Sequence, residues 1–133
     1  MEQLCLSLLA FAAQLGGYDT PAACPVVERA PKEVLWKYVC PNQACPVTGV
    51  YVYGDKRLLI ADNLKLQNLY TRSVIVHELV HYLQDLNGEA EDKECNAHLL
   101  RERVAFFVQV KFLRANYFRA DLRPSLNLYK CSG

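Results

Sequence analysis

Two histidines and a glutamate carry the clearest chemical signal in this sequence. His77, Glu78 and His81 belong to an H-E-x-x-H pentad, which holds two of the three histidines in the chain. Successive residues of an α-helix turn by about 100°, so side chains four positions apart lie on one face. Both imidazoles can therefore reach one metal ion. Glu78 lies beside them and can serve as a general base for a water that the metal activates.

The residues around the pentad predict an amphipathic helix. Thr71 or Ser73 can cap its N-terminus, and the pair Asn87-Gly88 supplies a stop at its C-terminus. A stripe with the spacing i, i+3, i+4, i+7 is formed by Val76, Leu79, Val80 and Leu83. The histidines lie off this stripe, which favours a metal site over histidines that only form hydrogen bonds in a core.

The next helix offers a third metal ligand. A catalytic zinc site usually has three protein ligands and leaves one position open to water. A second helix is expected from about Glu89 to about Arg119, before Arg123-Pro124. Glu94 and His98 lie four positions apart on this helix, so they share a face, and its apolar side can pack on the first helix.

This pattern resembles the zincin metallopeptidases, and most closely the small single-domain bacterial glutamate zincins, or gluzincins. These enzymes take two histidines from H-E-x-x-H and a glutamate from the following helix. The resemblance implies that His77, His81 and Glu94 bind Zn²⁺ and that Glu78 is the general base in the hydrolysis of a peptide bond. Many gluzincins have an aspartate four residues after the ligand glutamate, where this chain has His98. His98 therefore stays open as the alternative ligand, with Glu94 then supporting the site from behind.

Two other kinds of metal site would also use residues of the pentad. A di-iron bundle would need a second E-x-x-H unit, which the sequence does not contain. A non-catalytic binding or effector module could use zinc as a staple between two helices, and such a site would be closed by four protein ligands. The carboxylate of Glu78 between the histidines argues against a staple, which has no need of a base.

Peptide hydrolysis also needs a donor for the oxyanion of the tetrahedral intermediate. Four side chains carry suitable groups, although packing in the core or on the surface would explain each of them too: Tyr82, Tyr117, Arg123 and Tyr129.

The remaining sequence predicts an α+β fold with a single domain over residues 1–133. Strands are expected at Val34–Val39, Val47–Tyr53 and Arg57–Ala61, which are rich in β-branched and aromatic residues. An N-terminal helix is expected over Leu4–Ala13, ending near Gly16-Gly17. The expected fold is a minimal zincin-like one: a small antiparallel or mixed sheet packed on an active-site helix and a long C-terminal helix. By resemblance, an edge strand of this sheet would bind an extended peptide or protein substrate.

Composition argues against two classes of partner. The 15 basic and 14 acidic residues leave a net charge of +1, so no electrostatic footprint for nucleic acid is expected. The apolar N-terminal run is too short to span a membrane, and no signal peptide is evident in this numbering.

Cysteine usage predicts disulfides. The chain has six cysteines, an even number that permits three bonds in fifteen pairings. Cys40 and Cys45 are the best local pair, with half of a second zinc site as the rival interpretation. A bond from Cys95 to Cys131 would pin the chain end over the active-site helices. Such cysteine usage predicts a periplasmic or secreted protein.

Overall fold

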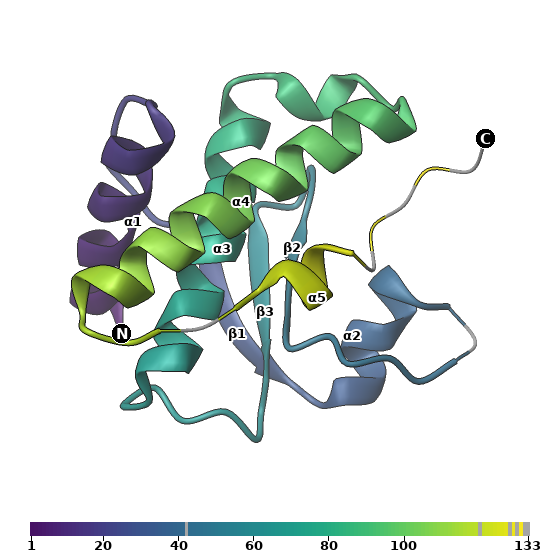
Figure 1. Ribbon diagram of the computed structural model, residues 1–133, viewed down its shortest axis with the longest axis horizontal. Helices are drawn as coiled ribbons and strands as arrows, with labels where there is room; N and C mark the ends of the chain where they lie inside the picture. The colour runs from purple at the N-terminus through teal and green to yellow at the C-terminus, as the bar shows by residue number, and fades with distance from the viewer. Residues whose placement is uncertain (42, 120, 128, 130, 132–133) are drawn as a thin grey trace.

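A computed structural model describes residues 1–41, 43–119, 121–127, 129 and 131. Its helices and strands follow one another along the chain as shown in Figure 1: α1 (Glu2–Gly16), β1 (Val26–Ala30), α2 (Lys32–Val39), β2 (Gly49–Val52), β3 (Arg57–Ala61), α3 (Leu69–Leu86), the 3₁₀ turn η1 (Glu89–Glu91), α4 (Cys95–Ala115) and α5 (Arg123–Leu126). The α+β class predicted from the sequence is confirmed.

The sheet is small and mixed. Its strand order is β1-β3-β2, with β1 parallel and β2 antiparallel to the central strand β3. Successive side chains of β3 point to opposite faces. Leu58 and Ile60 pack in the core with α1 and α3, whereas Leu59 and Ala61 pack with Leu35 of α2. Helices therefore cover both faces of the sheet, and β2 is left as one edge.

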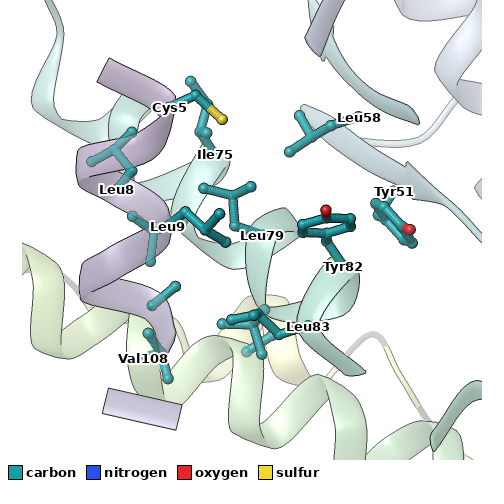
Figure 2. Close-up of a cluster of buried hydrophobic side chains, with 14 of the residues drawn as sticks. Cys5, Leu8, Leu9, Tyr51, Leu58, Ile75, Leu79, Tyr82, Leu83 and Val108 are labelled. Carbon is teal, nitrogen blue, oxygen red and sulfur yellow. The ribbon is translucent and has the colours of Figure 1, made fainter. Parts of the chain in front are cut away.

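The main core lies between α1, α3 and α4. Figure 2 shows Leu9 of α1 pointing toward Leu79 of α3, and Leu83 of α3 and Val108 of α4 belong to the same cluster. Burial of a leucine side chain contributes about 1.5–3 kcal/mol. The apolar stripe predicted for the pentad helix is thus turned toward α1. Its opposite side, which carries the histidines, faces α4.

The predicted helices are present with shifted ends. Helix α1 ends as expected, because Gly17 adopts the left-handed conformation (φ 78°) that favours glycine at this position. Helix α3 is capped by Asn68, whose side chain accepts a hydrogen bond from the backbone N–H of Tyr70. Helix α4 begins at Cys95, after the separate turn η1, and ends at Ala115.

The strand predicted at Val34–Val39 is wrong, because this segment forms α2. Its β-branched and aromatic residues favour a strand only weakly, and packing overrides that preference. Pro31 precedes the helix, and Leu35 is its one buried residue, packed against β2 and β3. A strand that was not predicted, β1, pairs in parallel with β3 instead.

Three disulfides link the chain: Cys5–Cys24, Cys40–Cys45 and Cys95–Cys131. The second confirms the predicted local pair, and the third attaches the C-terminal tail to the start of α4. In the described part of the chain, no helix is long and apolar enough to cross a membrane.

Candidate metal centre

Helices α3 and α4 bring together two histidines and one glutamate. His77 and His81 lie one turn apart on α3, each with only 5% of its surface exposed. On α4, Glu102 places its Oε2 atom 3.4 Å from Nε2 of His77 and its Oε1 atom against Nε2 of His81. The three ligand atoms lie within 4.8 Å of one another. This is the one cluster of three potential metal-binding residues among those that the structure describes.

The structure does not bring Glu94 to the histidines. Glu94 is the N-cap residue of α4 and is exposed, and the carboxylate that meets the histidines is that of Glu102. Glu94 and Glu102 are eight residues apart, which corresponds to about 12 Å along a helix axis. His98 lies midway, exposed and with its ring 5.8 Å from that of Tyr129, and is not part of the cluster.

The spacing of residues in the sequence also points to Glu102. Glu94, His98 and Glu102 are spaced by four residues, so they lie along one face of the same helix. The face of α4 that was predicted to carry the third ligand is thus the face that carries Glu102. The turn at which α4 crosses α3 depends on where the connection after α3 ends, and the turn η1 delays the start of α4 to Cys95.

A buried glutamine fixes the orientation of the His81 ring. The Nδ1 atom of His81 lies 2.8 Å from Oε1 of Gln84, and Nε2 of Gln84 donates to the backbone oxygen of Arg101 at 3.1 Å. A carbonyl oxygen only accepts, so the Gln84 amide must present its own oxygen to the histidine. His81 therefore carries its proton on Nδ1 and turns Nε2 toward Glu102. The Tyr53 hydroxyl lies 3.0 Å from the same Nδ1 atom.

A second buried glutamine, Gln109, fixes the orientation of the His77 ring. The Nδ1 atom of His77 lies 2.9 Å from Oε1 of Gln109, and Nε2 of Gln109 donates to Oγ of Ser73 at 3.1 Å. Ser73 in turn donates to the backbone oxygen of Tyr70 at 2.6 Å, so its oxygen is free to accept. Both imidazoles are thus held with Nε2 facing the same point, which is the arrangement that metal-binding histidines require.

The electrostatics of the cluster suit a cation. Burial alone would lower the pKa of His81, but the charge of Glu102, its hydrogen bond to the ring, and the weaker effects of Glu78 and Gln84 together outweigh burial and raise this pKa to about 9. Burial would raise the pKa of Glu102, and the two histidines together instead hold it well below its usual range. The Oε2 atom of Glu102 is buried and has no hydrogen-bond partner in the described residues. A metal ion would occupy the place of the shared proton and satisfy this oxygen.

The donor set fits zinc. Two imidazole nitrogens and one carboxylate oxygen are common ligands of catalytic Zn²⁺, and three protein ligands leave one position open. Glu78 lies beside the cluster, with its Oε2 atom 4.0 Å from Nε2 of His77. Burial raises the pKa of Glu78, while the two histidines oppose the increase.

The cluster opens into a groove of about 770 Å³. Helices α3 and α4 form one wall, and β2, the loop before it and the C-terminal tail form the other. Strand β2 approaches α3 closely at Gly49, where an added Cβ atom would lie 2.7 Å from Cγ1 of Val74 and 3.2 Å from Cγ of Glu78. The edge strand therefore passes directly beside the proposed base. In Figure 1 the tail with α5 crosses in front of β2.

Of the four suggested oxyanion donors, one lies in the groove. Tyr129 lines it, and its ring lies 6.1 Å from that of Phe106, which packs against His77. The other three are committed elsewhere: the Tyr82 hydroxyl donates to the backbone oxygen of Ala23, Tyr117 is 99% exposed, and Arg123 pairs with Asp121.

Comparison of the chain with protein-family models, with curated proteins and with solved structures found no match. The interpretation of the site therefore depends on its geometry and chemistry.

Proposed function

We propose that this protein is a zinc-dependent peptidase of the gluzincin type, in which His77, His81 and Glu102 bind the ion. The observation that carries the proposal is the position of Glu78. It is a buried carboxylate that lines the groove beside two histidines with fixed orientation, and it lies next to an edge strand. A staple between helices would not need such a residue.

The ion would polarise the peptide carbonyl and increase the acidity of the attacking water. Glu78 accepts the proton of this water and returns it to the leaving nitrogen. The raised pKa of Glu78 suits both steps, because a carboxylate with a higher pKa is a stronger base and still releases its proton. Gln84 and Gln109 hold the histidine rings throughout. Of the four side chains predicted as oxyanion donors, Tyr129 is the one that lines the groove, and we assign this role to it.

Strand β2 would bind the substrate. It pairs with β3 on one side only, and its residues Gly49–Val52 line the groove. An extended peptide can add to this edge as a further strand, because the backbone groups of an edge strand are free to form hydrogen bonds. The three disulfides suit a protein that works in an oxidising periplasmic or extracellular environment.

The test compares zinc-loaded wild-type protein with Glu78→Gln on a mixture of synthetic peptides, with cleavage followed by mass spectrometry. Glu78→Gln should keep one zinc per chain and the same circular dichroism but lose about 10²–10⁴-fold in cleavage rate. Glu94→Gln is the matched control and should cleave normally. Equal cleavage by Glu78→Gln would remove the general base. Absence of cleavage by zinc-loaded wild type would instead favour the zinc-stapled binding or effector module.

A further inference from the structure

Arg101 is a buried cation in the wall of the groove. Its side chain is 9% exposed, lines the groove and precedes Glu102 on α4. The Nη1 atom donates to the backbone oxygens of Glu89 at 3.0 Å and of Asp92 at 3.1 Å. The Nε atom is buried and has no hydrogen-bond partner in the described part of the chain. The guanidinium is therefore held in place by two neutral carbonyls, with part of its donor capacity unused.

The carboxylates nearest in sequence to these contacts are committed to other groups. Glu102 faces the two histidines. Glu89 accepts from the Tyr18 hydroxyl at 2.8 Å and from the Asn87 side chain, and Asp92 accepts from the backbone N–H of Glu94. Within the described residues, no carboxylate lies within 4.0 Å of the Arg101 nitrogens. A buried charge without a counter-charge is costly, so an anion from outside the chain would gain strongly by pairing with it.

The charged residues that line the groove fall into two groups. Its two carboxylates, Glu78 and Glu102, belong to the metal centre, whereas its lysine and arginine, Lys93 and Arg101, do not. Both groups act on Tyr53, whose hydroxyl lies 3.0 Å from Nδ1 of His81. Burial raises the pKa of Tyr53 above its usual value and Glu102 adds to the increase, while Arg101 acts in the opposite direction. An anionic ligand that reaches Arg101 would therefore meet no carboxylate of the groove other than those at the metal centre.

We propose that Arg101 binds a carboxylate of the substrate, so that the groove selects acidic peptides. An arginine stays charged when it is buried and forms charge-assisted hydrogen bonds to a carboxylate, which makes it suited to this task. Strand β2 runs from Gly49, which lies against Glu78, toward Tyr53, whose hydroxyl contacts His81 and on which Arg101 acts. A peptide that pairs antiparallel with β2 would therefore place the residues that precede the cleaved bond near Arg101. The carboxylate is then that of a glutamate or aspartate side chain, and a chain-terminal carboxylate would require the opposite direction. The role in substrate selection rests on the proposed peptidase function, whereas the binding of a carboxylate does not.

Binding is measured on the zinc-loaded Glu78→Gln background, which prevents turnover, by calorimetry with matched peptides. One pair differs only by glutamate or glutamine in an amide-capped peptide, and the other only by a free or an amidated C-terminus. We expect the glutamate peptide to bind about 10- to 100-fold more tightly than its glutamine counterpart. Arg101→Gln should remove this preference at unchanged zinc content, and Arg101→Lys should keep part of it. Arg103→Gln, an exposed arginine on the same helix, should keep all of it.

Equal binding of the members of both pairs by the protein with Arg101 intact would overturn the proposal. A preference that survives in Arg101→Gln would overturn it too, because Lys93 or the ion itself would then hold the carboxylate.

If the Arg101 variants do not fold, NMR of the arginine side chains in the unsubstituted protein decides. The Arg101 resonance must shift with the glutamate peptide and not with the glutamine peptide. If the protein binds the carboxylate peptide but the wild type does not cleave it, the proposed peptidase function is wrong and the carboxylate site is retained. If the wild type cleaves both peptides with equal kcat/KM, the peptidase function is retained and the role of Arg101 in selecting acidic substrates is wrong.

Discussion

The two walls of the groove are built in different ways. The helical wall, formed by α3 and α4, holds the histidines, Glu102 and the two glutamines in a buried network of hydrogen bonds. The tethered wall, formed by the loop before β2, by β2 itself and by the C-terminal tail, carries the disulfides Cys40–Cys45 and Cys95–Cys131. The groups proposed to bind the metal ion and to act as the base are therefore held by packed helices, whereas the loop before β2 and the C-terminal tail are held by disulfides.

Burial explains the difference. In α3, thirteen residues are buried, so its polar groups need partners inside the protein. In α2 only Leu35 is buried, and α5 has no buried residue. Short elements that bury so little apolar surface gain little free energy from packing. Disulfides supply order there by restricting the unfolded chain.

Removal of the third ligand should have the largest effect on the helical wall. Glu102→Ala should weaken zinc binding by more than about 100-fold, beyond the loss expected for a residue that only supports a ligand. Glu94→Ala is the matched control, since Glu94 is an exposed N-cap residue, and its zinc affinity should stay near that of wild type. Competition with a chelator of known affinity measures both. A greater loss in Glu94→Ala than in Glu102→Ala would return the ligand role to Glu94.

Loss of an orienting glutamine should have a smaller effect at the same site. Gln109→Ala or Gln84→Ala leaves the Nδ1–H of a buried histidine without its acceptor, so the ring can turn and zinc affinity should fall about 10- to 100-fold. Gln14→Ala, an exposed glutamine on α1, is the control. Zinc affinity is read by the same competition. Unchanged affinity in both variants would mean that helix packing alone orients the histidines.

The pentad and its helix could be predicted because their signals are local. The spacing of His77 and His81 and the stripe around Leu79 depend on the helical period alone. The carboxylate of the proposed metal site, Glu102, could not be placed, because its position depends on where α4 starts and at which turn α4 crosses α3. Both are set by the turn η1 and by tertiary packing.

The sheet was predicted in part for the same reason. The strands at β2 and β3 were expected, but the segment over α2 has residues that suit either structure, and its position against β2 and β3 decides the outcome. Strand β1 carries the polar residues Glu28 and Arg29 in the middle of its five residues, so its sequence gave little sign of a strand. The burial of Arg101 could not be predicted either, because the sequence does not reveal that the carboxylates nearby are already paired with other groups.

Removal of the disulfide that attaches the tail should have the smallest effect of these variants on the free energy of unfolding. It also tests whether the tail and the helices unfold together. The double variant Cys95→Ser/Cys131→Ser frees the tail, but the native tail then gains freedom together with the unfolded chain. The free energy of unfolding should therefore fall by less than about 2 kcal/mol. Cys5→Ser/Cys24→Ser is the contrasting variant. Cys5 lies in the main core, and the loss should be about 2–5 kcal/mol. Urea denaturation measures both.

Hydrogen exchange and chelation then locate the change. In the tail variant, exchange should increase around Tyr129, and a chelator should remove zinc a few-fold faster, because the tail no longer covers the groove. Exchange within α3 should stay slow, since that helix keeps its partners in α1 and α4. If the tail variant instead loses as much stability as the core variant, with faster exchange in α3, the tail belongs to the same cooperative unit as the helical wall. The two walls would then be held by different interactions but would unfold in one cooperative step.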